Sequence, residues 1–218
     1  MPEIDLLRAL PKTKRNLQQR TVGKDPEVVR LSKQFGEHYF DGPREYGYGG
    51  YRYDGRWQPV ARDIVAHYGL KPGMRVLDIG CAKGFLVKDL LGAGPGLEVF
   101  GLDISEYAVK HCPPEVVGRL HVGNCEALPF PDGSFDLVLA LDVIHNQKRD
   151  GAIRALREIG RVGKGNAFVR VDSYHTPEQK AVFEDWVLTA EFHDYPDGWL
   201  TLFEEAGYQG DWSWTIIS

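Results

Sequence analysis

The chain has 218 residues, of which 43% are hydrophobic and 26% are charged, and its formal net charge is −5. This size and composition predict one α/β domain with an additional segment, and the negative charge offers no overall attraction to nucleic acid. No apolar run is long enough for a membrane span, the first residues lack a signal-peptide pattern, and the three cysteines form no Cys-x-x-Cys pair. We therefore expect a cytoplasmic protein without a membrane or nucleic-acid partner and without zinc or disulfides.

Residues 1–60 are expected to form an N-terminal extension and cap, and residues 61–218 the main domain. Residues 12–33 carry an excess of lysine and arginine, which predicts a solvated helical face or an arm; an anionic partner is the alternative. In residues 34–60, glycines alternate with tyrosines and other aromatic residues. We interpret that segment as an ordered loop over a pocket.

The main domain opens with a short helix over residues 62–68. A run of branched apolar residues at 74–79 then predicts a buried strand. Small residues alternate after it at Gly80, Ala82 and Gly84, and a stretch with helical spacing follows. Strand, glycine turn and helix, in this order, form a ligand crevice at the strand ends of an α/β sheet, because glycine allows the backbone to approach a ligand closely.

Further elements follow at the spacing of an α/β domain. The predicted strands after the first are 97–105, a third one before Gly123, then 134–142 and 166–171, and the predicted helices are 150–162, 177–190 and 197–206. Asp197 is the expected N-cap of the last helix. Residues 208–217 form either one strand or a tight pair of strands.

Two kinds of cofactor use a glycine turn of this type. A dinucleotide site requires Gly-x-Gly-x-x-Gly, and that frame places Phe85 where the third glycine belongs. The frame that fits is Asp78-x-Gly80-x-Ala82-x-Gly84, which opens with an acid. This frame resembles the first motif of the class I S-adenosylmethionine-dependent methyltransferases, in which an acid precedes three alternating small residues.

The resemblance extends over residues 61–172. Asp103 ends the second strand about twenty residues beyond the turn, where a carboxylate can accept hydrogen bonds from ribose hydroxyls. The segment after the third strand, residues 123–130, holds the adenine in this family, and Asn124 stands where an Asp is usual. The resemblance implies a doubly wound, mostly parallel, Rossmann-like sheet with helices on both faces and an N-terminal helical and loop cap. The family sheet normally ends in an antiparallel strand, for which this chain leaves little room.

The implied cofactor is S-adenosyl-L-methionine. The resemblance implies that the following residues bind it: Asp78, Gly80, Cys81, Ala82, Gly84, Asp103, Ile104, Asn124, Cys125 and Leu141.

Methyl transfer needs an acceptor held in line with the methyl group and in some cases a base. His145, just past the fourth strand, is the first candidate for the base because its unperturbed pKa is close to neutral; packing against the cofactor or a backbone hydrogen bond is the alternative. Asp142 and Asp172 end neighbouring strands and are further catalytic candidates. No metal is expected, because Ser173 follows Asp172 where metal-dependent members carry Asn.

An aromatic face attracts a sulfonium cation, so aromatic residues are candidates for the acceptor site. The expected substrate-binding residues are Tyr46, Tyr48, Tyr53, Tyr174 and His193. The predicted function is methyl transfer to an O or N atom of a small molecule, a sugar or a secondary metabolite. Methylation of RNA or protein, and a cofactor-binding subunit without catalysis, are the alternatives. Whether the protein forms a homodimer is left open.

Overall fold

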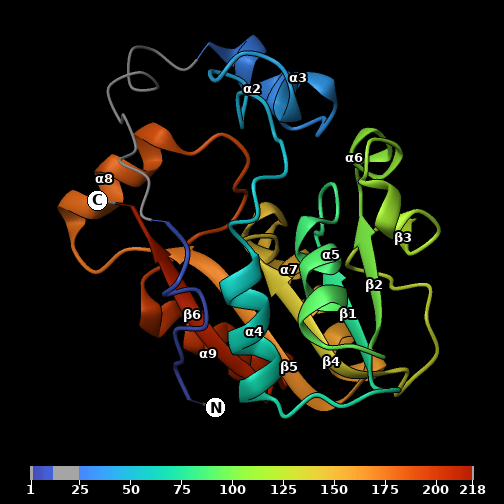
Figure 1. Cartoon of the computed structure of the whole chain (residues 1–218). Coiled ribbons are helices and arrows are strands. Elements are labelled where there is room, and N and C mark those ends of the chain that lie inside the picture. The colour runs from blue at the N-terminus through green and yellow to red at the C-terminus, as the bar shows by residue number, and fades with distance from the viewer. Residues whose placement is uncertain (1, 12–24, 218) are drawn as a thin grey trace.

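A parallel sheet forms the centre of the computed structural model, which describes residues 2–11 and 25–217 (Figure 1). Within these residues the strand order is β3-β2-β1-β4-β5-β6, and every neighbouring pair runs parallel. The strands are β1 Arg75–Ile79, β2 Glu98–Asp103, β3 Leu120–Val122, β4 Phe135–Leu141, β5 Gly163–Ser173 and β6 Asp211–Ile216. The order reverses between β1 and β4, which opens a crevice at the C-terminal ends of these strands. The predicted doubly wound sheet is confirmed.

Helices cover both faces of the sheet. Those of the main domain are α4 Gln58–His67, α5 Phe85–Ala93, α6 Glu106–Lys110, α7 Arg149–Val162, α8 Pro177–Trp186 and α9 Pro196–Ala206, with short 3₁₀ turns η1 Pro114–Val116 and η2 Ile144–Asn146. Figure 1 shows α4 and α5 on one face and α7 and α9 on the other. Alternate strand residues supply the two cores: Val76 packs on the side of α4 and α5, whereas Leu77 and Ile79 pack on the side of α7 and α9.

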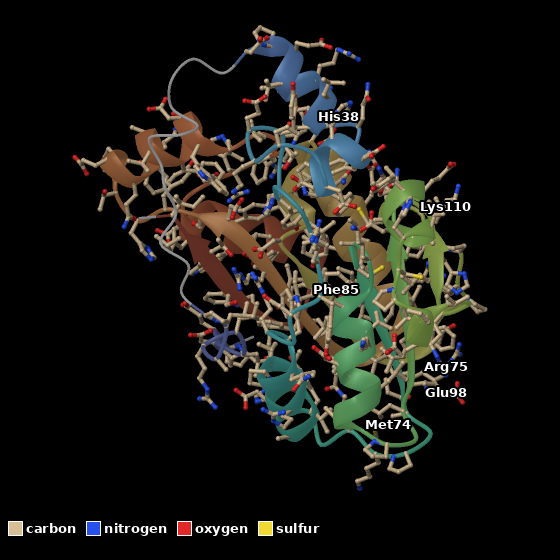
Figure 2. The ribbon with its side chains drawn as sticks, turned by 45° about the horizontal axis from the view of Figure 1, so that its top comes forward. His38, Met74, Arg75, Phe85, Glu98 and Lys110 are labelled. Carbon is tan, nitrogen blue, oxygen red and sulfur yellow. The ribbon has the colours of Figure 1, made fainter. Side chains whose placement is uncertain are left out.

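Residues 25–57, here called the cap, lie above the C-terminal ends of the strands (Figure 1). The cap contains α2 Pro26–Ser32 and α3 Glu37–Phe40, so the expected loop over residues 34–60 begins with a short helix. Figure 2 shows Phe85 at the end of α5 that lies toward the cap. In the same view Arg75 and Glu98 lie at the opposite end of the sheet, with Arg75 Nε 3.5 Å from Glu98 Oε2.

The N-terminal residues before the cap lie beside the last strand. The backbone N–H of Ile4 donates to the carbonyl of Trp212 at 2.9 Å, and Leu6 and Leu7 are buried in the core on the side of α4. The expected domain boundary between residues 60 and 61 falls inside α4, and the division into cap and domain stays a prediction. Most of the basic stretch lies outside the described residues.

Two local expectations are corrected, and one that the sequence left open is decided. Helix α8 ends at Trp186 rather than near residue 190, because the backbone of Val187 is extended, with a ψ of 139°. Asp197 is not the N-cap of α9: Pro196 opens that helix, as proline favours the first position, so Tyr195 is the cap residue and Asp197 lies in the first turn. Residues 211–216 form one strand, parallel to β5, and no antiparallel pair occurs in the described part of the chain.

None of the helices described here combines the length and the apolar character that crossing a membrane requires.

Candidate active site

The turn between β1 and α5 depends on left-handed backbone. Gly80 and Gly84 have φ angles of 72° and 74°, a region that a Cβ atom disfavours. A Cβ on Gly80 would also lie 2.7 Å from the side chain of Val143. Ala82 adopts the same region, with a φ of 50°, despite its methyl group. The turn therefore brings bare backbone close to the segment that follows β4.

Asp103, the last residue of β2, holds this turn. Its Oδ2 accepts a hydrogen bond from the backbone N–H of Ala82 at 2.7 Å, and its Oδ1 accepts one from Ser105 at 2.8 Å. Burial raises the pKa of Asp103, and the backbone hydrogen bonds oppose that shift. Since each carboxylate oxygen can accept more than one hydrogen bond, Asp103 retains the capacity to bind ligand hydroxyls.

A cavity of about 670 Å³, including space open to solvent, lies at the C-terminal ends of β1, β2 and β4. Most of the predicted cofactor residues line it: Gly80, Ala82, Asp103, Ile104, Asn124, Cys125 and Leu141. The cap adds an aromatic roof, made of Phe35, Tyr39, Phe40 and Tyr48. The predicted motifs and the cap therefore meet around one cavity.

The remaining predicted cofactor residues, Asp78, Cys81 and Gly84, do not line this cavity. Asp78 and Cys81 are buried beneath the turn, and Gly84 is the N-cap residue of α5. Burial, with the negative charge of Asp103 as a further cause, raises the pKa of Asp78 to about 8. The Asp78 carboxyl is therefore mostly protonated at neutral pH.

Asp142 presents a carboxylate to the cavity from the end of β4. Its backbone is left-handed, with a φ of 56°, and its side chain is 37% exposed. Its Oδ1 accepts a hydrogen bond from Thr215 Oγ1 at 2.6 Å, and Arg170 Nε lies 3.2 Å from the same oxygen. Arg170 also donates to Thr215. Strands β5 and β6 thus fix the direction of this carboxylate.

His145 lies one layer behind the cavity. Its Nδ1 accepts a hydrogen bond from the backbone N–H of Asp172 at 3.1 Å, and its Nε2 lies 3.3 Å from Asp172 Oδ2. An accepting Nδ1 means that the neutral ring carries its proton on Nε2, toward that carboxylate. Both side chains are buried, and neither residue lines the cavity. In this geometry His145 ties η2 to the end of β5 and turns no ring nitrogen toward the cavity.

The predicted substrate-binding residues fall in four places. Of this set, Tyr48 lines the cavity. Tyr46 packs beside His38, with ring centroids 5.4 Å apart, and Tyr53 donates a hydrogen bond to Asp89 Oδ1 on α5 at 2.6 Å. The other two, Tyr174 and His193, lie beside α8.

Tyr174 and His193 form a pair beside α8. The Tyr174 hydroxyl lies 3.0 Å from His193 Nδ1, and Phe183 packs against both rings. Burial, and then the charges of Asp194 and Glu184, raise the pKa of Tyr174 to about 12, while burial lowers the pKa of His193. This pair packs the α8 insertion onto the end of the sheet. The roles of all predicted site residues stay predictions.

Sequence reasoning missed several residues that the fold brings to the site. Phe35, Tyr39 and Phe40 were noted only as part of an aromatic stretch, although all three line the cavity from α3 and the residues just before it. Asn146 also lines the cavity, and its buried Oδ1 has no hydrogen-bond partner among the described residues. The sequence did contain one usable signal, a charged residue inside the glycine turn, Lys83. In the described ranges no group of three or more His, Cys, Asp or Glu residues is placed to hold a metal ion.

Comparison with known proteins supports the sequence motif. Residues 77–171 match the methyltransferase domain family. The chain is 32% identical over 162 residues to a 2-methyl-6-phytyl-1,4-hydroquinone methyltransferase of Synechocystis, an alignment covering 65% of this chain and 50% of that protein. It is 34% identical over 128 residues to a demethylmenaquinone methyltransferase of Symbiobacterium thermophilum, covering 55% and 50%. The chain spans about half the length of these curated relatives.

Solved structures share the fold. A SAM-dependent methyltransferase from Aquifex aeolicus superposes with a TM-score of 0.50 and 20% identity, over 85% of this chain and 89% of that chain. The YcgJ protein from Bacillus subtilis gives a TM-score of 0.54 with 21% identity, over 66% and 65%. Residues 77–171 therefore resemble a methyltransferase domain, and the parallel sheet that contains them has the fold of these solved structures.

Proposed function

We propose that the protein transfers the methyl group of S-adenosylmethionine to an oxygen or nitrogen atom of a small molecule, such as a sugar or a secondary metabolite. The observation that supports this most is the cavity that the glycine turn, Asp103 and the aromatic cap enclose together. Because the cap roofs the cavity, a small acceptor fits better than an RNA or a folded protein. A reaction at this place needs mainly alignment of the two reactants.

The residues present suit the cofactor. The glycine at position 80 lets the turn pack against Val143, where a Cβ would come within 2.7 Å, and Asp103 would hold the ribose hydroxyls. Asn124 and Ile104 would contact the adenine, and the unpaired Asn146 Oδ1 would accept a donor such as an ammonium group. When bound, the cofactor supplies a methyl group activated by a sulfonium centre. This chain supplies the binding groups and the orientation.

The charge of the cavity favours a neutral or cationic acceptor. The charged residues in its described lining are two acids, Asp103 and Asp142. A carboxylate or phosphate near the reacting atom would be repelled by these acids, since the described lining holds no lysine, arginine or histidine. Arg170, which lies outside the lining, offsets part of the charge of Asp142. The rings of Tyr39 and Tyr48 also attract cations. An alcohol or an amine is the acceptor that this environment suits best.

Asp142 is better placed than His145 to orient the acceptor or to receive its proton. Asp142 is one of the residues that line the cavity, and its second oxygen, Oδ2, is not the atom that Thr215 and Arg170 hold. His145 uses both ring nitrogens on Asp172. In this proposal His145 and Asp172 position the site from behind, and Asp142 acts in it.

A carbon acceptor is the second candidate. The chain is 34% identical over 108 residues to a sterol 24-C-methyltransferase of Gibberella zeae, an alignment that covers 46% of this chain and 28% of that protein. Relatives with hydroquinone and menaquinone names point the same way. The apolar roof of Phe35, Phe40 and Tyr48 would accept an aromatic ring as readily as an alcohol.

Labelled S-adenosylmethionine offered with a matched set of ring compounds tests the proposal. The set contains the same ring with a hydroxyl, an amine, a carboxylate or a hydroquinone, and mass spectrometry locates the label. The proposal predicts O- or N-methylation of the hydroxyl or amine compound. Methylation of a hydroquinone ring carbon would favour the second candidate, and methylation of the carboxylate alone would contradict the charge argument. A structure with S-adenosylhomocysteine in which side chains fill the space beside the sulfur would favour a non-catalytic subunit.

A further inference from the structure

Lys83 lies inside the cofactor turn but turns away from the cavity. Its side chain is only 8% exposed. Its ammonium donates to Asp41 Oδ1 at 2.8 Å, to Asp41 Oδ2 at 2.6 Å and to the carbonyl of Tyr51 at 3.0 Å. All three acceptors belong to the cap. Because an ammonium has three N–H donors, Lys83 uses its full hydrogen-bonding capacity on the cap.

Asp41 is the matching anchor at the end of α3. Its Oδ2 also accepts a hydrogen bond from the Tyr107 hydroxyl at 2.8 Å, and its Oδ1 accepts one from the backbone N–H of Tyr51 at 3.2 Å. Partial burial acts to raise the pKa of Asp41, but the hydrogen bonds from Lys83 and Tyr107 outweigh it and the pKa is lowered. The Asp41 carboxylate is therefore ionised at neutral pH.

The anchored segment is also the segment that roofs the cavity. Phe40 precedes Asp41 directly, and its carbonyl accepts the backbone N–H of Tyr51 at 2.8 Å. The ring of Phe40 stacks on that of Tyr48, with centroids 5.7 Å apart, and both rings line the cavity. A movement of Asp41 would therefore move the roof.

Other contacts hold the cap independently of this pair. The Ser105 hydroxyl donates to the carbonyl of Phe35 at 2.5 Å, and Lys33 Nζ forms an ion pair with Glu191 Oε1 at 2.6 Å. Tyr53 adds its hydrogen bond to α5. The cap can thus stay folded when the Lys83–Asp41 pair is broken, while its seating over the cavity changes.

We propose that the Lys83–Asp41 ion pair couples the cofactor turn to the cap, with Lys83 as the positioning residue that seats Phe40 and Tyr48 over the bound cofactor. The inference rests on the cofactor site of the proposed function. Coupling between two sites is reciprocal. The factor by which a seated cap raises cofactor affinity therefore equals the factor by which the cofactor favours the seated cap.

Calorimetry with S-adenosylhomocysteine tests the coupling in the full chain. Asp41→Asn keeps the shape of the side chain and removes its charge, and Lys83→Met is the second variant. We expect both to lower the affinity about 5- to 150-fold, the usual range of coupling between sites. Lys83→Arg, which keeps the charge, should retain most of the affinity. Lys164→Met is the control, because Lys164 pairs with Asp136 at the opposite end of the sheet.

Limited trypsin digestion supplies the second readout, since Arg44, Arg52 and Arg56 lie in the cap. S-adenosylhomocysteine should protect these sites in the wild type and protect them less in Asp41→Asn. Equal affinity and equal protection in wild type, Asp41→Asn and Lys83→Met would overturn the coupling and leave the proposed function intact. Failure of the wild type to bind S-adenosylhomocysteine would overturn the cofactor site, and the coupling with it.

Discussion

Gly80 and Ala82 share a left-handed backbone but differ in what a side chain meets. The methyl group of Ala82 is accommodated at the cavity wall, whereas a Cβ on Gly80 would lie 2.7 Å from the side chain of Val143. The central position of the turn, Ala82, therefore tolerates a departure from glycine, and the first position, Gly80, does not. This difference decides how closely the turn approaches the segment after β4.

Gly80→Ala is expected to cost more stability than Gly118→Ala. Both residues have positive φ, 72° and 80°, so both variants bear the left-handed penalty of about 1–2 kcal/mol. At Gly118 nothing lies within 4 Å of the added Cβ, while Gly80→Ala adds overpacking against Val143, commonly about 1–3 kcal/mol. Urea unfolding of the two variants measures the difference. Equal losses of unfolding free energy would show that the Val143 contact relaxes without cost.

Asp78 makes the cofactor-free protein less stable as the pH rises. The pKa of its carboxyl is raised to about 8 in the folded state, against about 3.9 in an unfolded chain. Between these values the folded state holds a proton that the unfolded state has released, so the free energy of unfolding falls as the pH increases through this window. Asp103 is the charged neighbour that adds to the shift.

Asp78→Asn removes this dependence, because the amide does not titrate. Urea titration should show that the unfolding free energy of the variant rises relative to that of the wild type from pH 5 to pH 8. The expected gain is about 1.4 kcal/mol for each pH unit in which only the folded state of the wild type holds the proton. Asp132→Asn, on an 81% exposed side chain, is the control. Parallel pH curves for wild type and Asp78→Asn would contradict the shift.

At the scale of elements, the turn η2 fixes the segment between α8 and α9 to the sheet. The carbonyl of His145 accepts hydrogen bonds from the backbone N–H groups of Glu191 and Phe192 at 2.9 and 3.1 Å, while its ring binds Asp172. Trp199 Nε1 donates to the carbonyl of Asp172 at 3.0 Å from α9. One histidine thus connects η2, the end of β5 and the insertion beyond it.

His145→Asn and His145→Ala separate a positioning role from a base. The Oδ1 of Asn can replace Nδ1 as the acceptor for Asp172 N–H, but the amide cannot take a proton at neutral pH. The positioning account predicts that His145→Asn keeps most of the turnover and His145→Ala does not, with the pH profile unchanged in both. If both variants lose about 10²–10⁴-fold in kcat, as expected for removal of a positioned base, His145 acts as the base after all.

At the scale of the whole molecule, the sequence was most informative where function depends on local backbone pattern. The buried strand, the glycine turn and the acid at the end of β2 are contiguous signals, and the fold places Gly80, Ala82 and Asp103 around one cavity. The Lys83–Asp41 pair joins residues 42 positions apart through the folding of the cap. No periodicity encodes such a contact. A loop over a pocket was predicted, but for the same reason the sequence did not reveal that Phe35, Tyr39 and Phe40 line the cavity.

The end of the chain shows the same limit. The pattern of residues 208–217 allowed one strand or two, and tertiary context decided for the single strand β6, beside which the N-terminal residues lie. The direction of the His145 ring was equally beyond the sequence, since it depends on where β5 places the N–H of Asp172. Local chemistry was predictable, and the partner of each polar group was not.

Calorimetric titration with S-adenosylhomocysteine and with NAD tests the central claim most directly. The account predicts that the wild type binds S-adenosylhomocysteine and not NAD, because the turn opens with an acid and carries Phe85 in the third glycine position of a dinucleotide site. Asp103→Ala should weaken binding by about 1–3 kcal/mol through loss of charged hydrogen bonds, and Asp132→Ala, on the exposed surface, should not. Preferential binding of NAD, or undiminished S-adenosylhomocysteine affinity in Asp103→Ala, would contradict the account.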